Sequence, residues 1–267
     1  MSGGIIRGRN PRPIILVDRE NAHKKIWLWR GGSGTSDEMK WHQIDDDVVV
    51  MSFPLKAFGI DFGRNVTLLR LRDGRVVVHS SAPFTDQDLS AIRRLGEPCW
   101  LVDASLLHDT FAKAGRAAFP DLPYLAPNGF TKTSGVTVQS LDNPPPDWHG
   151  ELDVLRIEGT RVNEYVFLHR RSRTLVTADL FFSFPRETRG WARFFSRHIM
   201  RLPRLFGISV FYRFLMINDR SAFERSMREL LRWDFANLVV AHRHPIEKTA
   251  RVAVETALRD FEFLRDI

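Results

Sequence analysis

The sequence contains a single cysteine, Cys99, among 267 residues. One thiol excludes an intramolecular disulfide and a thiolate zinc cluster, and next to Trp100 it is typical of a small core residue. No apolar run is long enough to span a bilayer, and residues 1–13 lack the apolar core of a signal peptide. These absences predict a cytoplasmic protein without a transmembrane segment, in which any bound metal has histidine and carboxylate ligands.

Apolar residues make up 43% of the chain, which is enough for a sizeable core in one large domain or two small ones. The net charge of +7 comes from arginine and is densest in the segment Arg186 to Arg213, where arginines alternate with Trp191, Phe194 and other aromatic residues. This composition suits a membrane-surface or protein contact, and nucleic acid is a further alternative. A solvated helix face with a buried opposite side explains the same residues.

Residues 1–45 contain two short apolar runs, at 14–17 and 26–29, followed by glycines at 31–34. We expect this N-terminal extension to form an added strand pair or a loosely docked arm. A second unit, residues 46–267, then forms the main domain.

From Val48 the chain alternates between strand and helix patterns. The Asp73-Gly74 pair separates two β-rich runs and predicts a hairpin turn. Thr85 is a predicted N-cap for a helix over 86–95, and a second helix is predicted over 105–118. Strands are predicted at 48–51, 66–71, 75–78 and 100–102.

The second half repeats this alternation after the rigid Asn143-Pro144-Pro145-Pro146 stretch. Short helices between 187 and 217 are interrupted by Pro203 and Gly207, and Ser221 with Glu224 predicts a capping box for the next helix. The last helix is predicted from Pro245 to the C-terminus. Strands are predicted at 154–157, 164–168, 174–176 and 238–240. The chain thus passes twice through strands and then helices around a strand, which predicts two β/α halves with helices outside.

Four polar residues stand where apolar, strand-like runs end: His79, His108, Asp179 and His242. Side chains at the ends of buried strands can converge on one edge of a sheet, where α/β proteins usually build their sites. The set therefore predicts a metal or catalytic cluster. Taken one at a time, these residues are also typical of strand and helix caps.

Three stretches resemble motifs of the metallo-β-lactamase fold. Residues 173–182 are similar to its strand ending in T-G-D-x-L-F, residues 239–245 to its late P-G-H-G-x-P loop, and residues 101–109 to its H-x-H-x-D-H segment. The resemblance implies an α/β fold, a four-layer αββα sandwich in which two mixed β-sheets are flanked by helices. From Asn65 onward the chain looks like an uncharacterised branch of that superfamily, a domain of unknown function.

The resemblance also implies a degenerate set of metal ligands. Asp179 matches the bridging aspartate, and His108 and His242 match two ligands of the second metal position. Asp103, Ser105 and Leu107 stand at the other three positions of H-x-H-x-D-H, and Thr160 stands where the middle histidine would lie. The first metal position has therefore lost three ligands.

Two histidines and a carboxylate around an open position are enough for one zinc, iron or manganese ion. We therefore expect His108, Asp179 and His242 to bind metal, with His79, Asp109 and His244 as catalytic candidates for a fourth ligand, a general base or an orienting partner. The implied function is a single-metal hydrolase of an ester, thioester, amide or phosphoester, acting on a small molecule that the sequence does not identify. The alternative is a catalytically inactive scaffold that uses the basic and aromatic segment to bind a protein, a lipid surface or nucleic acid.

Overall fold

The computed structural model describes residues 14–17, 25–28 and 41–261 of the chain. Two strands of the predicted N-terminal extension, β1 (Ile14–Val17) and β2 (Lys25–Leu28), pair antiparallel. The rest of residues 1–40 and the end of the predicted last helix, residues 262–267, lie outside the described residues. The division of the chain at residue 45 stays a prediction.

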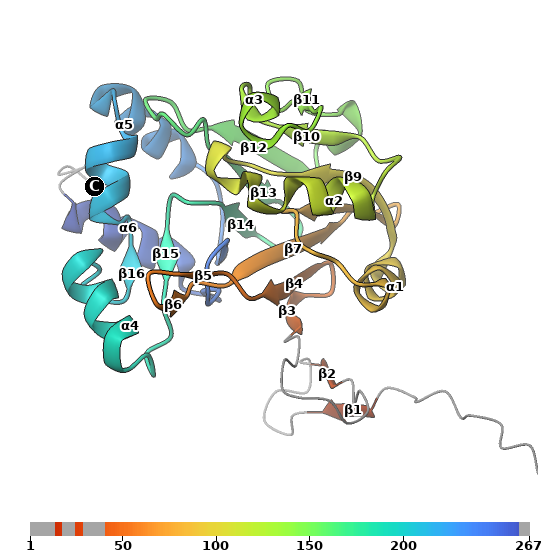
Figure 1. Cartoon of the computed structure of the whole chain (residues 1–267), viewed down its shortest axis with the longest axis horizontal. Coiled ribbons are helices and arrows are strands. Elements are labelled where there is room, and N and C mark those ends of the chain that lie inside the picture. Colours follow the sequence, from red (N-terminus) through yellow and green to blue (C-terminus); the bar gives the residue numbers. More distant parts are fainter. Residues whose placement is uncertain (1–13, 18–24, 29–40, 262–267) are drawn as a thin grey trace, which may run out of the picture.

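Seven strands between residues 41 and 140 form the larger sheet: β3 (Trp41–Asp45), β4 (Val48–Phe53), β7 (Arg64–Arg70), β8 (Arg75–His79), β9 (Glu97–Val102), β10 (Tyr124–Ala126) and β11 (Gln139–Ser140). Their order is β11-β10-β9-β8-β7-β4-β3 (Figure 1). The strands from β8 to β11 pair in parallel, and the strands from β3 to β8 pair antiparallel. The predicted hairpin is confirmed, because Asp73 and Gly74 join β7 to β8 and Gly74 has a φ of 89°, which glycine adopts without strain.

Four strands between residues 152 and 240 form the second sheet: β12 (Leu152–Arg156), β13 (Tyr165–His169), β14 (Thr174–Thr177) and β17 (Asn237–Val240). They lie in that order, and the last two are parallel. Thr177 is the partner of Val240 in this pair. The loops that follow β14 and β17 therefore begin side by side at one edge of the sheet.

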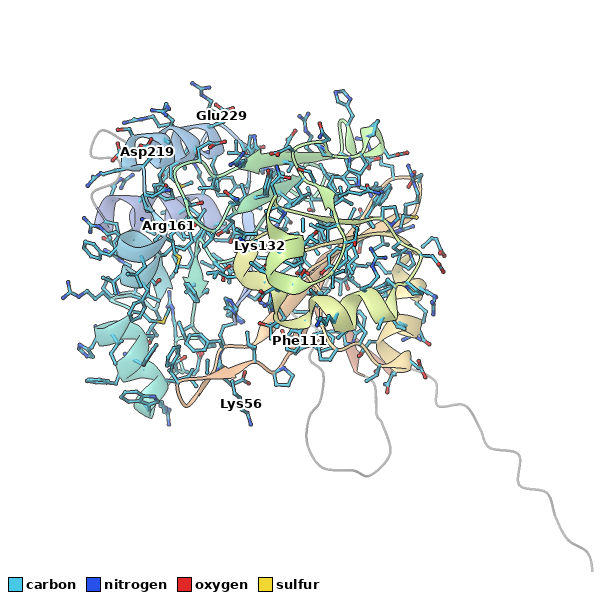
Figure 2. All side chains as sticks on the ribbon, turned by 45° about the horizontal axis from the view of Figure 1, so that its top comes forward. Lys56, Phe111, Lys132, Arg161, Asp219 and Glu229 are labelled. Atoms are coloured by element: carbon cyan, nitrogen blue, oxygen red, sulfur yellow. The ribbon has the colours of Figure 1, made fainter. Side chains whose placement is uncertain are left out.

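Helices cover the outer faces of the two sheets: α1 (Asp86–Leu95) and α2 (Ala112–Ala118) on the larger one, and α5 (Arg220–Leu230) and α6 (Ala250–Asp260) on the smaller one (Figure 1). One apolar cluster lies between the sheets, with Val77 and Trp100 from the first and Phe167 and Val176 from the second. Two further clusters lie under the outer helices. Figure 2 shows side chains filling the space between these layers. The predicted four-layer αββα sandwich is confirmed.

Short elements gather at one end of the sandwich, where Figure 1 shows them at lower left. They are the ribbons β5 (Lys56–Ala57) with β6 (Ile60–Asp61) and β15 (Phe182–Ser183) with β16 (Phe206–Gly207), the helix α4 (Gly190–Phe194), and the π-helical turns η3 (Phe195–Ile199) and η4 (Tyr212–Met216). A separate apolar cluster that includes Phe62, Phe184 and Leu202 joins β6, β15, α4 and η3, whereas residues of β16 and η4 pack in the cluster under α5 and α6. The predicted interruption of the short helices by Pro203 and Gly207 is confirmed.

Three predicted helix starts differ from the structure. The last helix, α6, begins at Ala250 and not at Pro245, because Ile246 pairs with Leu238 in an isolated β-bridge. The expected helix over 105–118 begins as a 3₁₀ helix, η1 (Leu106–Phe111), and passes into α2 through a kink at His108, which has φ −92° and ψ 20°. The predicted Ser221–Glu224 capping box is wrong, because the Asp219 carboxylate accepts the Ala222 N–H at 3.0 Å and caps α5 two residues earlier. The predicted Thr85 cap is confirmed and forms a full capping box with Asp88.

The remaining short helices are α3 (Phe130–Ser134) and η2 (Pro146–Trp148). No helix in the described part of the chain is both long and apolar enough to cross a membrane.

Candidate metal centre

Three predicted ligands meet at one edge of the paired sheets. His108 lies in η1 shortly after β9, Asp179 follows β14, and His242 follows β17. One ligand atom from each residue lies within 4.8 Å of the other two, and all three side chains are buried. Each imidazole Nε2 lies 3.4 Å from Asp179 Oδ1. The structure thus brings together residues that are up to 134 positions apart, from 108 to 242.

A backbone carbonyl sets the tautomer of His242. The Nδ1 atom donates to Gly63 O at 2.8 Å, and a carbonyl can only accept. In the neutral ring Nε2 therefore carries the lone pair and points toward Asp179. Phe182 stacks on the imidazole with 5.3 Å between ring centroids, which restrains the orientation of the ring.

A buried serine sets the tautomer of His108. Ser80 Oγ accepts from Arg64 Nη1 at 3.1 Å and donates to Asp103 Oδ1 at 2.9 Å. Because the one hydroxyl proton is given to Asp103, the 3.2 Å contact with His108 Nδ1 requires the imidazole to be the donor. Nε2 of His108 is then left with a lone pair, as in His242.

Three electron-pair donors therefore face one another with no hydrogen between them. Within the described residues, His108 Nε2 and Asp179 Oδ2 are buried and have no hydrogen-bond partner. An unsatisfied buried polar atom costs about 1–3 kcal/mol, and a cation at this point would remove that cost. Two imidazole nitrogens and a carboxylate are the donor set of many catalytic zinc and iron sites. The residues present fit a single metal ion.

A buried arginine adds positive charge beside this group. The Arg64 side chain is only 1% exposed, and burial lowers its pKa despite the nearby carboxylates of Asp103 and Asp179. Burial, with Arg64 acting in the same direction, lowers the pKa of His108. Burial opposes the ionisation of Asp179, but when the facing imidazoles of His108 and His242 carry a second proton they outweigh burial and hold the pKa of Asp179 well below its ordinary value.

The residues that the resemblance places at the first metal position form other interactions. Asp103 accepts hydrogen bonds from Ser81 N at 3.0 Å and Ser81 Oγ at 2.5 Å, as well as from Tyr124 and Ser80. Its oxygens are therefore committed to protein donors. Thr160 Oγ1 donates to Ile157 O at 3.2 Å. Among the described residues only the group of His108, Asp179 and His242 has the spacing of a metal site.

Asn65 holds the loop that carries His242, and the sequence did not single it out. Its Nδ2 donates to Val240 O at 2.8 Å and to Arg243 O at 2.7 Å, and its backbone N–H donates to Ala241 O at 2.8 Å. These bonds hold the backbone on both sides of His242 in the sequence. The only signal in the sequence is a polar residue just before the apolar run at 66–71.

Glu164 holds the loop that carries Asp179. Its Oε1 accepts hydrogen bonds from the N–H groups of Ala178 and Leu180 at 2.9 and 3.0 Å. These two residues directly precede and follow Asp179 in the sequence. Tyr212 donates to the other carboxylate oxygen at 3.1 Å. Burial, with the charge of Asp179 second, raises the pKa of Glu164 to about 8. The sequence did not link Glu164 to this loop, and the signal that could have done so is a glutamate at the start of an apolar, strand-like run.

The three predicted catalytic candidates lie outside the group. His79 is buried, its ring packs edge-on against Phe167 with 5.0 Å between centroids, and burial lowers its pKa to about 3. Asp109 is half-buried in η1, directly after His108. His244 is exposed, and its ring faces His42 at 6.2 Å between centroids. Their catalytic roles stay predictions.

A pocket of about 260 Å³ opens over the group and includes Asp179, His242 and Arg64 in its wall. The rest of the wall is mostly apolar, with Phe62, Phe182, Met200 and Met216 among its residues. A larger hollow of about 630 Å³ lies beside residues 120–124 and 135–139, and it contains none of the three ligands. Of these two hollows, only the smaller one reaches the group.

No protein-family model and no curated protein match the chain. Solved structures match it over most of its length. DIM-1 metallo-β-lactamase exposed to ceftazidime is 13% identical, with a TM-score of 0.57, over 85% of this chain and 100% of that one. A metallo-β-lactamase from Pontibacter korlensis is 10% identical, with a TM-score of 0.56, over 84% and 100%. One from Erythrobacter litoralis is 12% identical, with a TM-score of 0.56, over 85% and 93%. The narrower resemblance to a domain of unknown function stays a prediction.

Proposed function

Because the chain has the metallo-β-lactamase fold, we propose that it is a single-metal hydrolase of an ester, thioester, amide or phosphoester. The observation that supports this is the group of three buried electron-pair donors from His108, Asp179 and His242, of which Asp179 and His242 line a pocket. The metal is zinc, iron or manganese, and the substrate is a small molecule. The predicted cytoplasmic location goes with this proposal.

The protein supplies the ligands and their orientation. His108 and His242 present Nε2 because Ser80 and Gly63 accept from their Nδ1 atoms. A bound metal lowers the pKa of a coordinated water toward ~7 and polarises the scissile group. Arg64, in the pocket wall, stabilises negative charge on the substrate.

The candidates for proton transfer differ in their exposure. Asp109 is half-buried beside His108 and is the first candidate for a general base. His244 is exposed and is the second, because a side chain in contact with solvent can exchange protons. His79 is buried against Phe167 and is better suited to orienting its neighbours than to exchanging protons.

Elemental analysis of protein purified without a metal-affinity tag tests the metal. We expect near-stoichiometric zinc, iron or manganese, lost in His108→Ala and in Asp179→Ala. His169→Ala is the matched control, since His169 is an equally buried histidine that bonds to Ser172 and Arg70 O near the start of β14. Protein that stays metal-free after addition of each metal contradicts the proposal.

The inactive scaffold is the competing function, with a protein, a lipid surface or nucleic acid as the partner of segment 186–213. It requires no metal at the group of three ligands. The same analysis therefore separates the two functions, because the scaffold predicts that His108→Ala and Asp179→Ala leave the metal content unchanged at zero.

A further inference from the structure

Exposed hydrophobic side chains gather around the pocket over the metal site. Eight large hydrophobic residues are exposed in the described part of the chain. Three of them, Phe58, Leu107 and Phe211, line this pocket, and four more lie on α4 and η4, next to residues of the pocket wall. We call these seven the hydrophobic rim: Phe58, Leu107, Trp191, Phe194, Phe211, Phe214 and Leu215. The eighth, Val252, lies on α6. A single exposed hydrophobic residue is ordinary, but a contiguous patch around a pocket indicates an interaction site.

Direct contacts tie much of the rim together. Trp191 Nε1 donates to Phe58 O at 2.9 Å, and Trp191 stacks on Phe194 with 5.6 Å between centroids. Phe58 stacks in turn on Phe195, a residue of the pocket wall, at 5.8 Å. Phe214 and Leu215 lie on η4, between pocket residues Tyr212 and Met216. The rim thus stays exposed although its aromatic rings already pack on one another.

Positive charge surrounds the rim. Segment 186–213 contains seven arginines and one acidic residue, Glu187. Four of these arginines, Arg186, Arg189, Arg197 and Arg201, are exposed, and none of them forms an ion pair with a carboxylate of the described residues. Lys56 adds a further cation beside Phe58, at the outer edge of the molecule on β5 (Figure 2). Aromatic residues flanked by unpaired cations complement the headgroup region of an anionic membrane.

We propose that the hydrophobic rim and its arginines place the protein on an anionic lipid surface, and that the pocket takes the apolar chain of an amphiphilic substrate from it. The substrate class rests on the proposed hydrolase function, whereas the membrane contact does not. Most of the pocket wall is apolar, and its polar residues are Arg64, Thr110, Ser209, Tyr212 and the two candidate ligands Asp179 and His242. This arrangement places a carbonyl or phosphoryl group at the metal site while the hydrocarbon lies against the phenylalanine side chains. A nucleobase or a polar peptide would have to bury hydrogen-bonding groups against the phenylalanine and methionine side chains of this wall, which costs free energy.

Vesicle co-sedimentation of the full-length, metal-free protein tests the membrane contact. We expect binding to phosphatidylcholine vesicles that contain phosphatidylglycerol, and weaker binding in high salt or without the anionic lipid. The triple variant Phe194→Ser, Phe214→Ser, Leu215→Ser should lower binding at least tenfold. Val252→Ser is the control, because it removes an equally exposed hydrophobic residue outside the rim. Equal binding by both variants overturns the proposal.

Charge is tested separately. Replacing Arg186, Arg189, Arg197 and Arg201 by glutamine should lower binding to the anionic vesicles at least tenfold and leave binding to neutral vesicles within twofold. A matched control replaces four exposed arginines elsewhere: Arg72, Arg93, Arg225 and Arg228. Equal losses in both sets indicate a non-specific charge effect and overturn the assignment of this surface. Binding to an oligonucleotide with none to vesicles also overturns it.

The pocket is tested with dodecanoate and the metal-free protein, by titration calorimetry. Leu107→Trp narrows the pocket from a position that is 46% exposed, so the fold tolerates it. We expect this variant to lose dodecanoate binding and to keep vesicle binding. Dodecanoate binding that Leu107→Trp does not change refutes the amphiphilic substrate. Because His108→Ala should keep vesicle and dodecanoate binding, failure of the metal proposal and failure of this one give different results.

Discussion

Asn65 offers a sharp test of how the candidate metal site is held in place. Asn65→Ala removes three side-chain hydrogen bonds. Two run from Nδ2 to Val240 O and Arg243 O, on either side of His242 in sequence, and the third is the one that Oδ1 accepts from Ser52 Oγ at 2.7 Å. Each bond contributes about 1 kcal/mol, and leaving buried carbonyls unpaired adds to the loss, so we expect a destabilisation of about 2–4 kcal/mol. For a chain of this size that corresponds to a fall in Tm of roughly 5–15 °C.

The same change should weaken metal binding. Without the clamp, the loop no longer presents His242 Nε2 to Asp179, and removal of such a supporting partner typically costs about 10–100-fold in affinity. Stability is measured by denaturant unfolding of the metal-free protein, and affinity is measured by titration calorimetry with zinc. The two measurements separate loss of folding from loss of the site.

Asn237 is the matched control. It also bridges two segments, because its Nδ2 donates to Ser172 O at 3.1 Å and its Oδ1 accepts Lys248 N at 2.9 Å, and it lies at the opposite end of β17 from His242. Asn237→Ala should therefore lower stability comparably and leave zinc affinity within about twofold. Equal losses of affinity in both variants, or no loss in Asn65→Ala, would show that the clamp does not position the ligand.

Two further predictions concern buried titratable groups. Glu164→Gln keeps an oxygen that accepts the N–H groups of Ala178 and Leu180, so it should retain metal in elemental analysis. Glu164→Leu leaves both N–H groups unpaired, so it should lose metal together with about 2–6 kcal/mol of stability. Equal behaviour of the two variants would refute this role. Burial lowers the pKa of His79 to about 3. Below pH 6.5 the imidazole is therefore protonated in the unfolded chain but stays neutral in the folded chain. The free energy of unfolding falls as the pH is lowered through this range. His79→Leu should remove about 2 kcal/mol of the stability difference between pH 7 and pH 5 in urea unfolding, and an unchanged difference would contradict the assignment.

Much of the fold followed from local patterns. Apolar runs with β-branched residues, turn pairs such as Asp73-Gly74 and the Thr85 cap each act over a few residues, so their outcome is visible in the sequence. The same holds for the positions of His108, Asp179 and His242, each of which directly follows or closely trails a strand. Their order along the chain, matched to the metallo-β-lactamase motifs, indicated the ligand set before any distance was known.

The start of α5 shows where local patterns fail. Ser221 and Glu224 satisfy the capping pattern, yet Asp219 supplies the cap, and Glu224 instead pairs with Arg220 at 2.7 Å. Several polar residues near a helix start compete for the same N–H groups. The outcome depends on how the preceding loop approaches the helix, which the sequence pattern does not describe.

The sequence by itself determined the order of strands and helices and the residue types at the strand ends. Only the tertiary structure decided which of the possible ligand atoms have no hydrogen-bond partner. The Asp103 carboxylate accepts hydrogen bonds from Ser80, Ser81 and Tyr124. His108 Nε2 and Asp179 Oδ2 have no hydrogen-bond partner among the described residues. Strand pattern and turn chemistry are set by neighbours along the chain. Hydrogen-bond satisfaction is set by residues that meet only on folding, such as Asn65 and Val240, which are 175 positions apart.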